Sequence, residues 1–74
     1  MMNKRELFKM YLSEEIERAE ENYKRWEESN SFYQTSDKAS AELRTYYRRE
    51  TEVAYELWQY KLKYFNKCFR NDSL

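Results

Sequence analysis

The sequence predicts an all-α fold: an antiparallel two-helix hairpin that self-associates into a helical bundle. Three observations lead to this prediction. The 74 residues include neither glycine nor proline, the residues that punctuate turns and sheets. Apolar side chains recur at helical spacing in both halves of the chain, on either side of a polar stretch. The aromatic content of 19% is typical of a folded chain, because disordered chains are poor in aromatic residues.

The first helix is expected over about residues 4–29. Asn3 can cap it, and Glu6 occupies the reciprocal position of a capping box. The predicted apolar seam advances by three or four residues at each step and comprises Phe8, Leu12, Ile16, Ala19, Tyr23 and Trp26. Leu7 and Met10 lie off this seam and are expected to be exposed.

The connection is expected over about residues 30–36, where serine, asparagine and threonine are frequent. Ser36 or Asp37 is expected to cap the second helix, which then runs over about residues 37–70. Because a short connection makes successive helices antiparallel neighbours, residues 1–74 are predicted to form a single helical-hairpin domain.

The second helix carries more apolar surface than one neighbouring helix can cover. Residues 43–69 hold eight of the fourteen aromatic side chains, and their apolar positions span an arc about 200° wide. A helix packed on one neighbour needs roughly half of that. We therefore expect a copy of the chain to cover the rest, giving a four-helix bundle or a larger assembly. The predicted interface residues are Tyr47, Glu50, Ala54, Leu57, Trp58, Lys61 and Phe65.

Glu50 and Lys61 lie inside this arc, where an isolated charge is costly. If two copies of the helix cross antiparallel about a two-fold axis between Tyr55 and Glu56, Glu50 faces Lys61 of the other copy. Such a pair fixes register more than it adds stability. In the alternative interpretation both side chains extend to the rim of the arc or pair with the first helix.

Catalysis is the function that the sequence supports least. The chain has no histidine, which removes serine triads, an activated thiol and most zinc sites, and it has no glycine-rich phosphate loop. Glu14, Glu17 and Glu21 share one face of the first helix, but the second helix offers no matching acidic set. Cys68 lies on the apolar arc and is expected to be a buried, inert thiol. We expect no metal and no cofactor.

Composition favours a cytoplasmic protein that does not enter a membrane. The single cysteine excludes an internal disulfide, which suits a reducing compartment. No apolar stretch approaches the length of a membrane span. The formal net charge is zero, so no overall field attracts nucleic acid or a membrane surface.

The expected function is therefore that of a small interaction or regulatory protein, such as an inhibitor, that binds copies of itself and another protein. The alternative is a nucleic-acid or nucleotide binder. Lys63, Lys67 and Arg70 share one face near the C-terminus, with Tyr60 beside them. Basic side chains interleaved with aromatic rings can contact phosphates and stack on bases.

Overall fold

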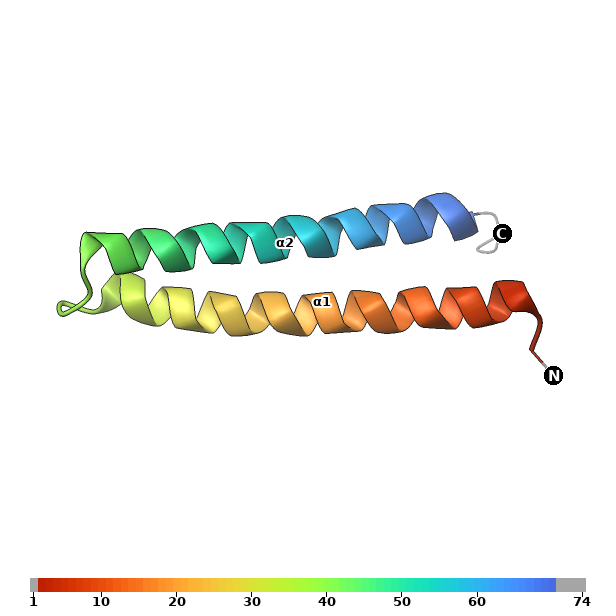
Figure 1. The fold of residues 1–74 in the computed structure, drawn as a ribbon, viewed down its shortest axis with the longest axis horizontal. Helices are drawn as coiled ribbons and strands as arrows, with labels where there is room; N and C mark the ends of the chain where they lie inside the picture. Colours follow the sequence, from red (N-terminus) through yellow and green to blue (C-terminus); the bar gives the residue numbers. More distant parts are fainter. Residues whose placement is uncertain (1, 71–74) are drawn as a thin grey trace.

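The computed structural model describes residues 2–70, which form two helices, α1 (Lys4–Thr35) and α2 (Ala41–Phe69). The helices lie side by side and antiparallel, so the start of α1 and the end of α2 share one end of the molecule (Figure 1). The resulting rod measures 55 × 21 × 17 Å. The predicted all-helical hairpin is confirmed, and the described residues contain no strand.

Asn3 caps α1, as predicted. The Asn3 side-chain oxygen accepts a hydrogen bond from the Glu6 backbone N–H at 2.8 Å, which satisfies one of the free donors of the first turn. Leu7 and Met10 are 52% and 46% exposed, as predicted for positions off the seam. Ala19 is buried against α2 and marks the centre of the seam.

The end of α1 was predicted too early, because the helix continues to Thr35 instead of ending near residue 29. Contacts with α2 stabilise these last turns. The Tyr33 ring stacks on Tyr47 with centroids 4.3 Å apart, and the Gln34 amide donates to the Arg44 carbonyl at 2.8 Å. Local sequence alone favours a turn here, so these long-range contacts decide the boundary.

The connection consequently covers residues 36–40, and the predicted cap of α2 by Ser36 or Asp37 is wrong. The Ser40 hydroxyl accepts from the Leu43 backbone N–H at 3.1 Å and caps α2. Ser36 instead ends α1, where its carbonyl accepts from the Arg44 guanidinium at 2.7 Å. This bond joins the end of α1 to the first turn of α2.

One face of α2 packs on α1 along its whole length. We call it the inner seam; it consists of Tyr47, Thr51, Ala54, Trp58, Lys61, Phe65 and Phe69. Thr51, Ala54 and Phe69 are its buried members. The Thr51 hydroxyl lies 3.1 Å from the Trp26 carbonyl oxygen of α1. Aromatic pairs fill the space between these points, among them Tyr23 and Trp58 with ring centroids 5.5 Å apart.

Candidate interaction surface

The hairpin itself uses most of the residues that the sequence assigned to an interface between copies. Tyr47, Ala54, Trp58 and Lys61 all belong to the inner seam and make contacts with α1 or are buried beside it. Phe65 is half-buried on the same seam and packs on Phe69 with ring centroids 5.0 Å apart. These five side chains are therefore engaged within the hairpin and do not form a free surface for a second copy.

Lys61 has its partner within the chain. Its ammonium group donates to a Glu15 carboxylate oxygen at 3.0 Å, so the alternative interpretation, a pair with the first helix, is the one that the structure supports. This hydrogen bond and the positive charge of Lys61 hold the pKa of Glu15 below its ordinary value. Glu50, the other charge within the arc, is half-buried on the neighbouring face of α2.

That neighbouring face is a second apolar stripe, which we call the outer stripe. It consists of Tyr46, Glu50, Val53, Leu57, Tyr60 and Tyr64. Its members are separated by four, three, four, three and four residues, the spacing of a coiled-coil seam. Apart from Glu50 they are between 43% and 67% exposed. The outer stripe thus has the spacing of a helix-packing surface. α1 covers it only in part, for example where the Trp26 and Tyr46 rings meet with centroids 6.1 Å apart.

The two stripes of α2 are adjacent. Each residue of the outer stripe directly precedes a residue of the inner seam, so the two faces are about 100° apart on the helix. This relationship explains the wide apolar arc seen in the sequence, which is the sum of two heptad stripes. Of the outer stripe, the sequence prediction places only Glu50 and Leu57 in an interface between copies, because the sequence does not show which part of the arc α1 takes; Tyr46, Val53, Tyr60 and Tyr64 are not among the predicted interface residues. The doubled heptad spacing is the sequence signal that separates the two stripes.

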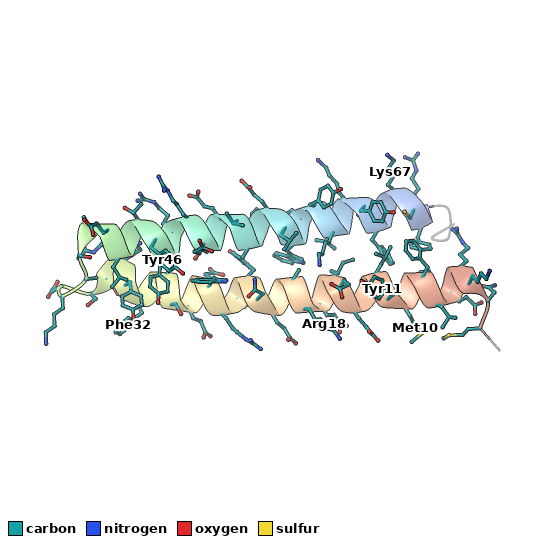
Figure 2. The ribbon with its side chains drawn as sticks, in the orientation of Figure 1. Met10, Tyr11, Arg18, Phe32, Tyr46 and Lys67 are labelled. Atoms are coloured by element: carbon teal, nitrogen blue, oxygen red, sulfur yellow. The ribbon has the colours of Figure 1, made fainter. Side chains whose placement is uncertain are left out.

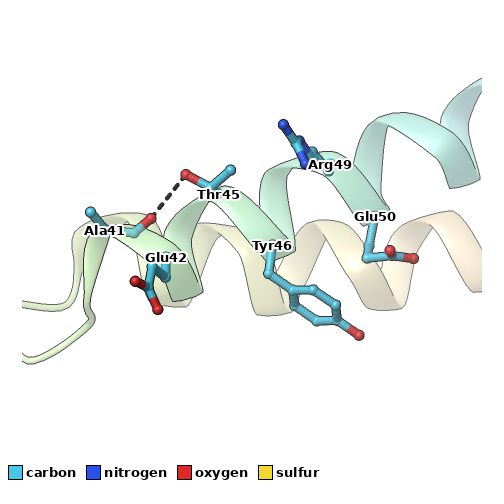
Figure 3. A pocket seen from close by; sticks show the side chains of 6 residues that line it. All are labelled: Ala41, Glu42, Thr45, Tyr46, Arg49 and Glu50. Atoms are coloured by element: carbon cyan, nitrogen blue, oxygen red, sulfur yellow. Dashed lines mark hydrogen bonds between the residues drawn. The ribbon is translucent and has the colours of Figure 1, made fainter.

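Two hollows are each lined by two members of the outer stripe. One, of about 450 Å³, lies over the first turns of α2, where Tyr46 and Glu50 point to the same side of the helix while Arg49 points elsewhere (Figure 3). The other, of about 180 Å³, lies between the helices and is lined by Tyr11, Glu15, Tyr60, Lys61 and Tyr64 among others. Both hollows are open at the surface and mostly apolar, which suits side chains of a partner better than an enclosed small molecule.

The residues predicted to bind phosphate lie at the end of the molecule that holds the start of α1. Lys63, Lys67 and Arg70 are exposed, and Lys67 projects away from α1 (Figure 2). The fold adds Arg5 and Lys9 of α1, whose charged groups lie 4.9 and 5.7 Å from the centroid of the Phe69 ring. Residues 2–12 and 62–70 together carry six basic side chains and one carboxylate, Glu6. We call this region the basic end. Tyr60 lies on the outer stripe beside it.

The remaining predicted features are placed as follows. Glu14, Glu17 and Glu21 are exposed on α1, and within residues 2–70 no three histidine, cysteine or acidic side chains are grouped as metal ligands would be.

Cys68 is half-buried beside Tyr64, and this contact raises the pKa of the Tyr64 hydroxyl. Neither α1 nor α2 is apolar over a length that could cross a bilayer.

Comparison with known protein families, with curated protein sequences and with solved structures finds no match to this chain.

Proposed function

We propose that this chain is a small non-enzymatic binding protein that acts in a regulatory role, such as that of an inhibitor or adaptor. It binds other proteins and copies of itself through the outer stripe of α2. The observation that supports the proposal is the exposure of five large apolar side chains at heptad spacing on one helix face. From Tyr46 to Tyr64 this face is about 27 Å long, at 1.5 Å per residue.

The chemistry of the stripe favours a protein partner. Three of its exposed members are tyrosines, and tyrosine is enriched at protein interfaces because its ring is apolar and its hydroxyl can still form hydrogen bonds. A contiguous apolar stripe of this kind differs from the isolated exposed side chains that any soluble protein carries. An amphipathic helix of a partner, with anchors at the same spacing, would fit such a surface.

The test compares two arginine substitutions at equally exposed positions. Leu57, on the outer stripe, and Met10, on the outside of α1, are both 46% exposed. Immobilised wild-type protein and Met10→Arg should retain the same proteins from a cell extract, and Leu57→Arg should lose them. Retention of an unchanged set by Leu57→Arg would show that binding does not use the outer stripe.

The basic end favours a second candidate function, the binding of nucleic acid or nucleotides. Lys63, Lys67 and Arg70 from α2 lie at the same end of the hairpin as Arg5 and Lys9 from α1, so positive charge from both helices could act on one polyanion. Tyr60, with an exposed ring, could stack on a base.

This candidate is tested with a fluorescent single-stranded oligonucleotide. Binding should weaken steeply as salt is raised, and Lys63→Ala should reduce the slope of log affinity against log salt concentration by about 0.7, the value for one phosphate contact on a single strand. Lys38→Ala, an exposed position in the connection at the other end of the hairpin, is the matched control and should leave the slope unchanged. Absence of binding at low salt would reject the candidate.

A further inference from the structure

We propose that the outer stripe is covered by the outer stripe of a second copy, antiparallel and related by a two-fold axis at the level of Tyr55. The inference rests on the proposed binding function and specifies its partner and register. It also replaces the pair between Glu50 and Lys61 of another copy that the sequence suggested, because Lys61 is bound to Glu15 within the hairpin.

The order of residues in the stripe is self-complementary about this point. With the axis at position 55, Tyr46 meets Tyr64 of the second copy and Val53 meets Leu57. Glu50 meets Tyr60, so the only carboxylate of the stripe faces a hydroxyl that can donate to it. Each pairing is made twice, as a two-fold axis requires. In this register an aromatic side chain therefore faces an aromatic one, an aliphatic side chain faces an aliphatic one, and the carboxylate faces a hydrogen-bond donor.

The parallel arrangement is disfavoured by the same residues. It would place Glu50 against Glu50 of the second copy, and two carboxylates brought together in a partly desolvated seam repel each other. In the antiparallel arrangement the two Glu50 side chains are ten residues apart along the paired helices, about 15 Å at 1.5 Å per residue. The negative charge of Glu50 thus favours the antiparallel over the parallel orientation of the second copy.

The exposed area of the hairpin agrees with a missing partner. A compact monomer of 9.4 kDa exposes about 5,000 Å², whereas this chain exposes 6367 Å². The excess is larger than the roughly 800 Å² that each partner contributes to a standard protein interface. Pairing along α2 at that standard size would remove about 800 Å² of this exposed area from water.

Sedimentation equilibrium of the full chain tests whether the occupant is a second copy. Wild-type protein should have twice the 9.4 kDa mass of one chain, and Leu57→Arg should have the mass of one chain. Met10→Arg should remain dimeric, and circular dichroism should show that all three proteins keep their helices. A wild-type chain that stays monomeric at high concentration would overturn the proposal, and so would a dimer that Leu57→Arg leaves intact.

Disulfide trapping tests the register, in a Cys68→Ser background that removes the native thiol. A mixture of Tyr46→Cys and Tyr64→Cys chains should form cross-linked pairs of the two kinds of chain, because these positions face each other. Tyr46→Cys alone should not cross-link, since the two cysteines would be about 27 Å apart along the helices and a disulfide needs Cα atoms within about 7 Å. Efficient cross-linking of Tyr46→Cys with itself would indicate the parallel arrangement and reject the register.

The two proposals can fail separately. If the wild type is a monomer and Leu57→Arg still loses its protein partners, the second copy is rejected and the binding function stands. If the wild type is a dimer broken by Leu57→Arg, but the set of retained proteins does not change, the pairing stands and the outer stripe is not the surface that binds other proteins.

Discussion

The Lys61 ammonium group and the Glu15 carboxylate form an ion pair of 3.0 Å that joins α2 to α1. Their side chains are 29% and 24% exposed, so the pair is better shielded from water than the ion pairs within α1, such as Lys24 with Glu20. Lys61 thus completes the inner seam as a charged member with an internal partner. This leaves the outer stripe with one charge, that of Glu50.

Acid should weaken the hairpin through Glu15. The hydrogen bond and charge of Lys61 lower the pKa of Glu15 in the folded chain. Glu15 therefore stabilises the fold fully at pH values above its unfolded pKa, about 4.3 for glutamate, and this stabilisation is lost as the pH falls through the folded pKa. Thermal melts at one protein concentration should show Glu15→Gln less stable than wild type at pH 7. The difference should disappear well below about pH 4. Glu17→Gln is the control; a pH-independent difference for Glu15→Gln would contradict the prediction.

Exchanging the charges of Lys61 and Glu15 should restore the thermal stability that reversing the charge of Lys61 alone removes. Lys61→Glu places a second carboxylate beside Glu15 and should lower the melting temperature, and addition of Glu15→Lys should recover most of the loss. Glu50→Lys should not rescue Lys61→Glu, since Glu50 lies on the outer stripe. Rescue by Glu50→Lys would instead support a pair between copies.

Ala54 is 4% exposed on the inner seam, where the space between the helices is small. We expect Ala54→Leu to destabilise the fold by about 1–3 kcal/mol, because the added methylene groups force the helices apart. Ala41→Leu, at the exposed start of α2, should change stability by less than about 0.5 kcal/mol. Urea unfolding followed by circular dichroism measures both, and equal effects would mean that the seam tolerates larger side chains.

The cap of α2 can be located by mutation. Ser40→Ala removes the hydroxyl that accepts from the Leu43 N–H and should cost about 1 kcal/mol of folding free energy. Asp37→Ala, at the position favoured from the sequence, should have an effect below about 0.5 kcal/mol. A larger loss from Asp37→Ala than from Ser40→Ala would place the start of the helix earlier than the structure does.

Alkali should destabilise the hairpin through its packed tyrosines. The pKa of Tyr47 is raised chiefly by its hydrogen bond with Tyr33, and burial raises the pKa of Tyr23. A raised pKa means that the folded chain binds the hydroxyl protons of these tyrosines more tightly than the unfolded chain does. The two tyrosines therefore stabilise the fold fully below about pH 10, and this stabilisation is lost as the pH rises further. Ultraviolet difference spectroscopy should show that some tyrosines ionise only well above about pH 10, and Tyr47→Phe should have fewer such tyrosines. Ionisation of all tyrosines near pH 10 would contradict this.

The sequence by itself determined the helical hairpin and the cap at Asn3. Helical periodicity and N-capping depend on residues a few positions apart, so they can be read locally. The wide apolar arc of the second helix was also visible, because it follows from the order of side chains around one helix. In the folded hairpin Leu57 and Tyr60 remain exposed, which fits an apolar arc wider than α1 alone can cover.

Only the tertiary structure decided how the arc is divided and where the helices end. The register of α1 against α2 gives Lys61 its partner Glu15 and assigns Trp58 to the inner seam and Leu57 to the outer stripe. The extension of α1 to Thr35 likewise depends on Tyr33 stacking on Tyr47. These outcomes depend on the relative position of residues distant in sequence, which is set by packing between the helices and which local propensities do not encode.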